Sequence, residues 1–150
     1  MADKMITSFS HIYLPVKDVD QAIDFYTRNL GFKLFRKYRM AEGGNASAYV
    51  ELGDVLLELT QARGPVPADE GRVEGRIGLT VTDMDAVTKD LKSKGVEFER
   101  EPFDARTFWG RQAMIKDPSG NGISLREWQA PDNPRFDGWQ PRHEGVTRLA

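Results

Sequence analysis

The sequence of 150 residues contains no cysteine. The chain therefore has no disulfide, no thiolate nucleophile and no sulfur ligand for a metal ion, a composition that fits the reducing cytoplasm, where we expect the protein to reside. The sequence also lacks an apolar run long enough to cross a bilayer. Its first residues, MADKMITSF, lack the apolar core of a signal peptide. We expect neither secretion nor membrane insertion.

An excess of charge of one sign is absent as well. The 21 lysines and arginines nearly balance 23 aspartates and glutamates, for a net charge of -2. Such a balance offers no electrostatic attraction for nucleic acid or for an anionic membrane surface. The length suits one domain with a hydrophobic core. We expect the partners to be small molecules and a second copy of the chain.

The feature that organises the sequence is an internal repeat. HIYLPVKDVD, residues 11–20, recurs as RIGLTVTDMD, residues 76–85, and DVLLEL at 54–59 aligns with GNGISL at 120–125. A repeat of this length in so short a chain predicts two copies of one structural unit within a single fold. The copies differ at functionally interesting positions: Arg76 stands where the first copy has His11, and Ser124 where it has Glu58.

Hydrophobic periodicity predicts the elements of each copy. Apolar residues alternate along 10–16, as in a strand, and the following helix is capped by Asp18 or Asp20 and ended by Gly31. Further strands are expected at residues 32–40, 46–52 and 55–61, with a turn at 41–45. After a linker at 64–75 we expect a strand at 76–81, a helix at 86–94 capped by Asp83 or Asp85, and strands at 97–101, 111–116 and 122–128, with a turn at 117–121.

These elements predict an α+β fold. Paired βαβββ units, at about 8–62 and 74–128, would form a single domain over residues 1–128, with curled mixed sheets around a cleft. Residues 129–150 have no clear period, and we expect an irregular C-terminal arm that packs on the surface. Strand alternation directs the side chains of Glu58, Arg76, Ser124 and Arg126 into the cleft and those of Ile77, Val55 and Leu57 under the helices.

Four segments between residues 11 and 125 resemble the vicinal oxygen chelate superfamily, which includes glyoxalase I, methylmalonyl-CoA epimerase, extradiol dioxygenases and bleomycin resistance proteins. The segments are HIYLPVKDVDQAIDFYTRNLGF, YVELGDVLLEL, RIGLTVTDMD and WGRQAMIKDPSGNGISL. The resemblance implies paired βαβββ units, a homodimer and a small-molecule site in each cleft. The stretch Trp109 to Arg111 is similar to the bleomycin-binding branch.

The resemblance also implies where a metal would lie. In the glyoxalase-like branch a His and a Glu from each unit hold the ion, and these places correspond to positions 11, 58, 76 and 124. His11 and Glu58 keep the ligand types, whereas Arg76 and Ser124 do not. A guanidinium offers no lone pair to a cation. We therefore expect an eroded site without a cofactor, the alternative being zinc, nickel, manganese or iron at His11 and Glu58.

The candidate site residues admit two interpretations each. Arg76 is suited to a carboxylate, phosphate or enolate oxygen, with Arg126 and Ser124 beside it; the alternative is an ion pair between Arg76 and Glu58. His11 is either a ligand-contacting residue or a hydrogen-bonded strand histidine. Four aromatic residues are candidates either for the walls of a ligand site or for the core: Trp109, Tyr49, Phe35 and Tyr38.

Three functions remain open on the sequence alone. The first is metal-independent binding of a small oxygenated or aromatic molecule. The second is a metal-free enzyme with Glu58 or His11 as general base and Arg76 as oxyanion stabiliser. The third is a metal-dependent lyase or isomerase of the glyoxalase I or epimerase type. A ring-cleaving dioxygenase is less expected, because the resemblance would then require His, His and Glu at 11, 76 and 124, and only His11 is kept.

Overall fold

A computed structural model describes residues 5, 8–39, 44–62, 75–106, 108–129, 145–147 and 149. They belong to two compact units, Met1–Glu70 and Gly71–Ala150, each of which is described by itself. Most of the turn expected at 41–45, of the linker at 64–75 and of the arm at 129–150 lies outside the described residues. Within the described part, no helix is long and apolar enough to cross a membrane.

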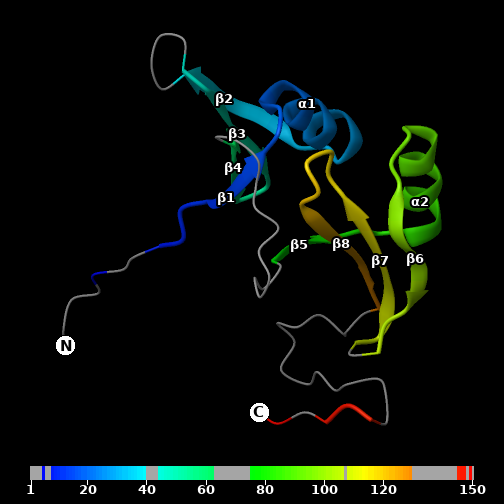
Figure 1. The fold of residues 1–150 in the computed structure, drawn as a ribbon. Helices are drawn as coiled ribbons and strands as arrows, with labels where there is room; N and C mark the ends of the chain where they lie inside the picture. The colour runs from blue at the N-terminus through cyan, green and yellow to red at the C-terminus, as the bar shows by residue number, and fades with distance from the viewer. Residues whose placement is uncertain are drawn as a thin grey trace, which may run out of the picture. The chain divides into compact units, whose positions relative to one another are not determined.

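The first unit is a four-stranded sheet with one helical segment (Figure 1). The elements in chain order are β1 (Ile12–Val16), α1 (Val19–Asp24), the π-helical η1 (Phe25–Asn29), β2 (Lys33–Arg39), β3 (Ala46–Leu52) and β4 (Val55–Gln61). The strand order is β1-β4-β3-β2, with β1 parallel to β4 and the other neighbours antiparallel. The first and the last strand of the unit are therefore neighbours.

The second unit repeats this plan. Its elements are β5 (Arg76–Thr80), α2 (Met84–Ser93), β6 (Phe98–Asp104), β7 (Gly110–Lys116) and β8 (Gly122–Trp128). The order β5-β8-β7-β6, with β5 parallel to β8, matches that of the first unit strand for strand. The predicted α+β class and the βαβββ order of both copies are confirmed.

The two copies begin their helices with the same local chemistry. Asp18 accepts a hydrogen bond from the backbone N–H of Gln21, and Asp83 accepts one from that of Ala86. The first aspartate of each repeated D-x-D is thus the N-cap, a bond that contributes about 1 kcal/mol. The second aspartate lies in the first turn, where its negative charge interacts favourably with the positive end of the helix dipole.

The core of each unit lies between its sheet and its helical segment. In the first unit Leu57 and Leu59 are fully buried, and in the second Ile123 and Leu125 are, as their alternation predicts. Burial of such a side chain stabilises the fold by about 1.5–3 kcal/mol. The prediction for Val55 was wrong: it is 45% exposed, because it is the first residue of β4, beside the turn at residue 53.

Strand β6 extends further than expected, to Asp104 instead of residue 101. The sequence contains Pro102, which removes a backbone donor and is an expected end of a strand. β6 is the edge strand of its sheet, and proline is tolerated in edge strands, where one side of the backbone has no neighbouring strand. Its pairing with β7 is interrupted between Phe98 and Arg100 and again between Arg100 and Phe103.

Candidate functional site

The first unit brings together His11 and Glu58, the pair that the sequence singled out. His11 directly precedes β1 and Glu58 lies on β4, and the parallel pairing of these strands sets Glu58 opposite Tyr13. The His11 Nε2 and Glu58 Oε2 atoms are 2.8 Å apart, and the side chains are 31% and 17% exposed. The imidazole and the carboxylate form a hydrogen-bonded pair that a ligand can still reach.

Two tyrosines surround this pair. The Tyr38 hydroxyl donates to Glu58 Oε1 at 2.8 Å, so both carboxylate oxygens of Glu58 are hydrogen-bonded. Burial and the hydrogen bond to Glu58 raise the pKa of Tyr38 to about 12, so the hydroxyl keeps its proton and remains the donor. The Tyr49 ring stacks on Tyr38, with ring centroids 5.8 Å apart, and meets the His11 ring edge-on at 5.7 Å. We call these four residues, His11, Tyr38, Tyr49 and Glu58, the histidine cluster.

The proton positions in the histidine cluster follow from its acceptors. When Glu58 is ionised it can only accept, so His11 Nε2 carries the proton between them. His11 Nδ1 lies 2.8 Å from the Ser10 hydroxyl, which can donate to it. In this tautomer His11 directs a proton, not a lone pair, toward Glu58. Chemically the pair is an acid–base dyad held by Tyr38.

Phe35, another predicted wall residue, lies apart from this chemistry in the structure. Its ring is 43% exposed, and the Arg36 guanidinium lies 4.6 Å from the ring centroid. The partner of Glu58 that sequence reasoning missed as a hydrogen-bond donor is Tyr38. Its place depends on a register shift in β2 between Leu34 and Arg36, which changes the parity on which strand patterns rely.

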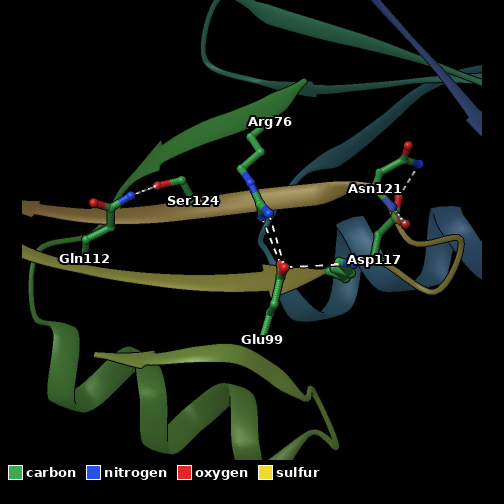
Figure 2. Close-up of polar contacts among 7 residues, drawn as sticks. Arg76, Glu99, Gln112, Asp117, Asn121 and Ser124 are labelled. Atoms are coloured by element: carbon green, nitrogen blue, oxygen red, sulfur yellow. Dashed lines mark hydrogen bonds and ion pairs between the residues drawn. The ribbon is translucent and has the colours of Figure 1, made fainter. Parts of the chain in front are cut away.

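In the second unit the Arg76 guanidinium binds the carboxylate of Glu99 with both arms of its fork (Figure 2). The two N–O distances are 2.9 and 3.2 Å, and Lys116 Nζ lies 3.9 Å from the same carboxylate. The hydrogen bond from Arg76 is the largest cause that lowers the pKa of Glu99. Within its own unit Arg76 therefore has a bidentate carboxylate partner, as Glu58 has His11 and Tyr38 in the other.

A glycine makes the reach of Arg76 feasible. Arg76 on β5 is paired with Gly122 on β8, and Glu99 is on β6 at the opposite edge of the sheet. A Cβ at Gly122 would lie 2.9 Å from Arg76 Nη1 and 3.0 Å from its Cγ. The bare backbone of Gly122 thus leaves room for the arginine to lie across the sheet.

Ser124, which stands at the Glu position of the repeat, is 5% exposed and accepts a hydrogen bond from Gln112 Nε2 at 2.9 Å (Figure 2). The strand that carries it starts after the predicted tight turn. There the buried Asp117 carboxylate accepts from the backbone N–H groups of Ser119 and Asn121 and from the Asn121 amide. Ser124 thus orients Gln112, which sequence reasoning did not identify.

Arg126, two residues after Ser124 on β8, has a different environment from Arg76. Its guanidinium lies 5.1 Å from the Phe108 ring centroid and 5.5 Å from that of Trp128, and these rings are 4.4 Å apart. Trp109, the predicted wall residue, is 46% exposed. The spacing of Trp128 two residues after Arg126, hence on the same face of one strand, was the signal that could have identified it.

A family model described as the Glyoxalase/Bleomycin resistance protein/Dioxygenase superfamily matches residues 8–125. The chain belongs to this superfamily. A probable lactoylglutathione lyase of Vibrio cholerae is 33% identical over 119 residues, which cover 77% of this chain and 86% of that protein. A lactoylglutathione lyase of Arabidopsis thaliana is 30% identical over 121 residues and 78% of this chain, which spans only 43% of that relative.

A solved superfamily structure has the same fold. The glyoxalase I of Leishmania major, described as trypanothione-dependent, superposes with a TM-score of 0.63 and 26% identity, covering 78% of this chain and 84% of that one. The predicted resemblance to the superfamily is confirmed by these similarities in sequence and in structure.

The residues present do not fit the four-ligand metal site of the glyoxalase-like superfamily branch. Two donors, His11 and Glu58, remain, and both are hydrogen-bonded to each other. Arg76 has no lone pair and carries a positive charge, and the Ser124 hydroxyl is a poor ligand. In neither unit does the described part of the chain group three His, Cys, Asp or Glu side chains in a way that could hold a metal ion.

Proposed function

We propose that this superfamily member binds a small oxygenated or aromatic organic molecule without using a metal ion. The observation that supports it best is the closed histidine cluster, in which Glu58 is bonded to both His11 and Tyr38. A carboxylate so engaged serves as a fixed hydrogen-bond acceptor and needs no cation to balance it. The replacement of the other two ligand types by Arg76 and Ser124 points the same way.

The histidine cluster offers a ligand two kinds of contact. Glu58 and His11 can exchange their mutual hydrogen bond for bonds to a ligand hydroxyl or carbonyl, and such charge-assisted bonds are strong. The half-buried rings of Tyr38 and Tyr49 offer apolar faces to an aromatic or alicyclic body. A ligand with an oxygen substituent on a ring satisfies both.

A ligand screen tests this function. The full chain would be screened by thermal shift against small oxygenated and aromatic compounds, and we expect hits that bind Glu58→Gln about tenfold more weakly or worse, because a charged acceptor is lost. Glu51→Gln, a half-buried glutamate on β3 of the same unit, is the matched control and should bind as wild type. Hits that bind both variants equally well, or only after a divalent ion is added, would contradict the proposal.

The names of the relatives favour a second candidate, a lyase or isomerase of the glyoxalase type. In a metal-free version His11 or Glu58 would act as general base, and Arg76 could stabilise an oxyanion only after leaving Glu99. A metal-dependent version would need zinc, nickel, manganese or iron at His11 and Glu58. Formation or breakdown of lactoylglutathione by the purified chain, with and without these ions, distinguishes both versions from pure binding.

We also propose that the protein acts as a cytoplasmic homodimer. Each of these four-stranded sheets has two edge strands that a second copy can cover, and most soluble oligomers are symmetric homo-oligomers, dimers above all. Sedimentation of the full chain at micromolar concentration should give twice the mass of one chain. A monomer at that concentration would contradict the dimer and leave the proposed ligand binding intact.

A further inference from the structure

Two arginines share one face of the sheet in the second unit. Arg76 on β5 is paired with Gly122, and Arg126 follows on β8 paired with Thr80, so register places both side chains on the same side. They differ in their partners. Arg76 is neutralised by the bidentate bond to Glu99, and Arg126 is surrounded by aromatic rings.

The guanidinium of Arg126 lies against two aromatic rings. Among the residues that the structure describes, its recorded side-chain contacts are with the rings of Phe108 and Trp128, and no carboxylate is within ion-pair distance. Phe108 is 1% exposed, so its ring belongs to the core. Aromatic faces orient a guanidinium and leave its N–H edge available for a planar acceptor.

The surroundings of Arg126 suit such an acceptor. Gln112 on β7 lies directly opposite Arg126, and the bond to buried Ser124 uses only one of its two amide N–H groups. Gly78 on β5 is paired with Ser124 on β8, and a Cβ added at Gly78 would have no heavy atom within 4 Å. The face beside Arg126 thus combines a fixed cation, an oriented amide donor and an open strand.

We infer that Arg126, with Gln112 beside it, forms a subsite for the carboxylate of an organic ligand. The subsite lies within the second unit, so this inference goes beyond the proposed function and does not depend on the histidine cluster. Arg126 is half-buried, and among the described residues no carboxylate lies within ion-pair distance of it. Its planar fork fits a carboxylate by two parallel N–H···O bonds. Glu99 occupies the fork of Arg76, whereas among the described residues the recorded contacts of the Arg126 guanidinium are with aromatic rings.

Arg100 provides a matched control for the test. Its guanidinium also lies over an aromatic ring, 3.5 Å from the centroid of Phe103, and it belongs to the same unit. It is exposed on the edge strand β6, however, where water can solvate the charge. Arg100→Met therefore removes the same charge and the same kind of stacking without touching the subsite.

The experiment titrates the full chain with benzoate and, separately, with neutral benzamide, following backbone amide signals by NMR. We expect the wild-type protein to bind benzoate more tightly than benzamide. Arg126→Met should lower the affinity for benzoate about tenfold or more, and Arg100→Met should leave it at the wild-type level. Arg126→Lys keeps the charge and the fold but loses the planar fork, and should regain only part of the affinity.

Three outcomes would overturn the inference. These are equal losses in the Arg126→Met and Arg100→Met variants, full affinity in Arg126→Lys, and loss of benzoate binding in Arg76→Met alone, which would place the anion at the Glu99 position. The proposed function fails independently. A wild-type protein that binds neutral compounds at Glu58 and shows no preference for benzoate would keep the function and remove the subsite.

Discussion

Gly110→Ala is expected to destabilise the second unit by about 3 kcal/mol or more, and so to unfold a marginally stable domain. A Cβ at this position would lie 2.0 Å from the backbone carbonyl oxygen of Glu127 and 3.0 Å from the buried ring of Phe108. The φ angle of Gly110, 152°, is one that side chains rarely adopt. Backbone cannot move aside as a flexible side chain can, so β7 and β8 would have to separate where they pair at Gly110 and Trp128.

The measurement is urea unfolding of the full chain, with Gly78→Ala as the matched control. Gly78 is also a strand glycine of the second unit, but an added Cβ there meets nothing within 4 Å, so its unfolding free energy should change by less than about 0.5 kcal/mol. Equal stability of the two variants would show that β7 and β8 are not packed as closely as the structure describes.

The second large effect concerns the metal. The double substitution Arg76→His with Ser124→Glu restores the four ligand types that hold the ion in the glyoxalase-like branch. We expect it to raise the affinity for zinc or nickel by roughly 100-fold or more, equivalent to about 2.7 kcal/mol. Isothermal titration of metal into the apo protein measures the change. The substitution also frees Glu99, whose pKa should return toward its ordinary range, because Arg76 is the largest cause of its lowering.

The control for this experiment is Arg100→His, which adds an exposed histidine to the same unit and should leave metal affinity at the wild-type level. Because no metal binding is linked to folding in the proposed function, a chelator should not change the melting temperature of wild type. A stoichiometric divalent ion in the purified wild-type protein, removed by chelator with a loss of stability, would contradict the proposal and favour the metal-dependent lyase.

Much of the fold could be read from local patterns. The repeat predicted two βαβββ units, and the alternation of residues 46–52, 55–61 and 122–128 predicted β3, β4 and β8 to the residue. These elements have regular pairing, so parity along the strand is conserved and side chains fall on the expected face. The structure then places His11, directly before β1, beside Glu58 on the neighbouring strand β4.

The partners of the site residues were decided by tertiary structure. Tyr38 and Glu99, which bind Glu58 and Arg76, lie on the edge strands β2 and β6, and both strands have register shifts against their neighbours. A bulge reverses the parity of every residue after it, so alternation cannot tell which side chain meets the sheet interior.

What the sequence by itself determined is the superfamily, the order of the elements and the loss of two metal-ligand types, because each depends on residue identity and local period. Only the tertiary structure decided which side chains the charged groups of the site contact. The fork of Arg76 is satisfied by Glu99, and the guanidinium of Arg126 is held by Phe108 and Trp128. Arg76 and Glu99 are 23 positions apart in the sequence, and Arg126 and Phe108 are 18 apart. A long side chain such as arginine can reach several neighbours, and the exact spacing of the strands determines which of them it contacts.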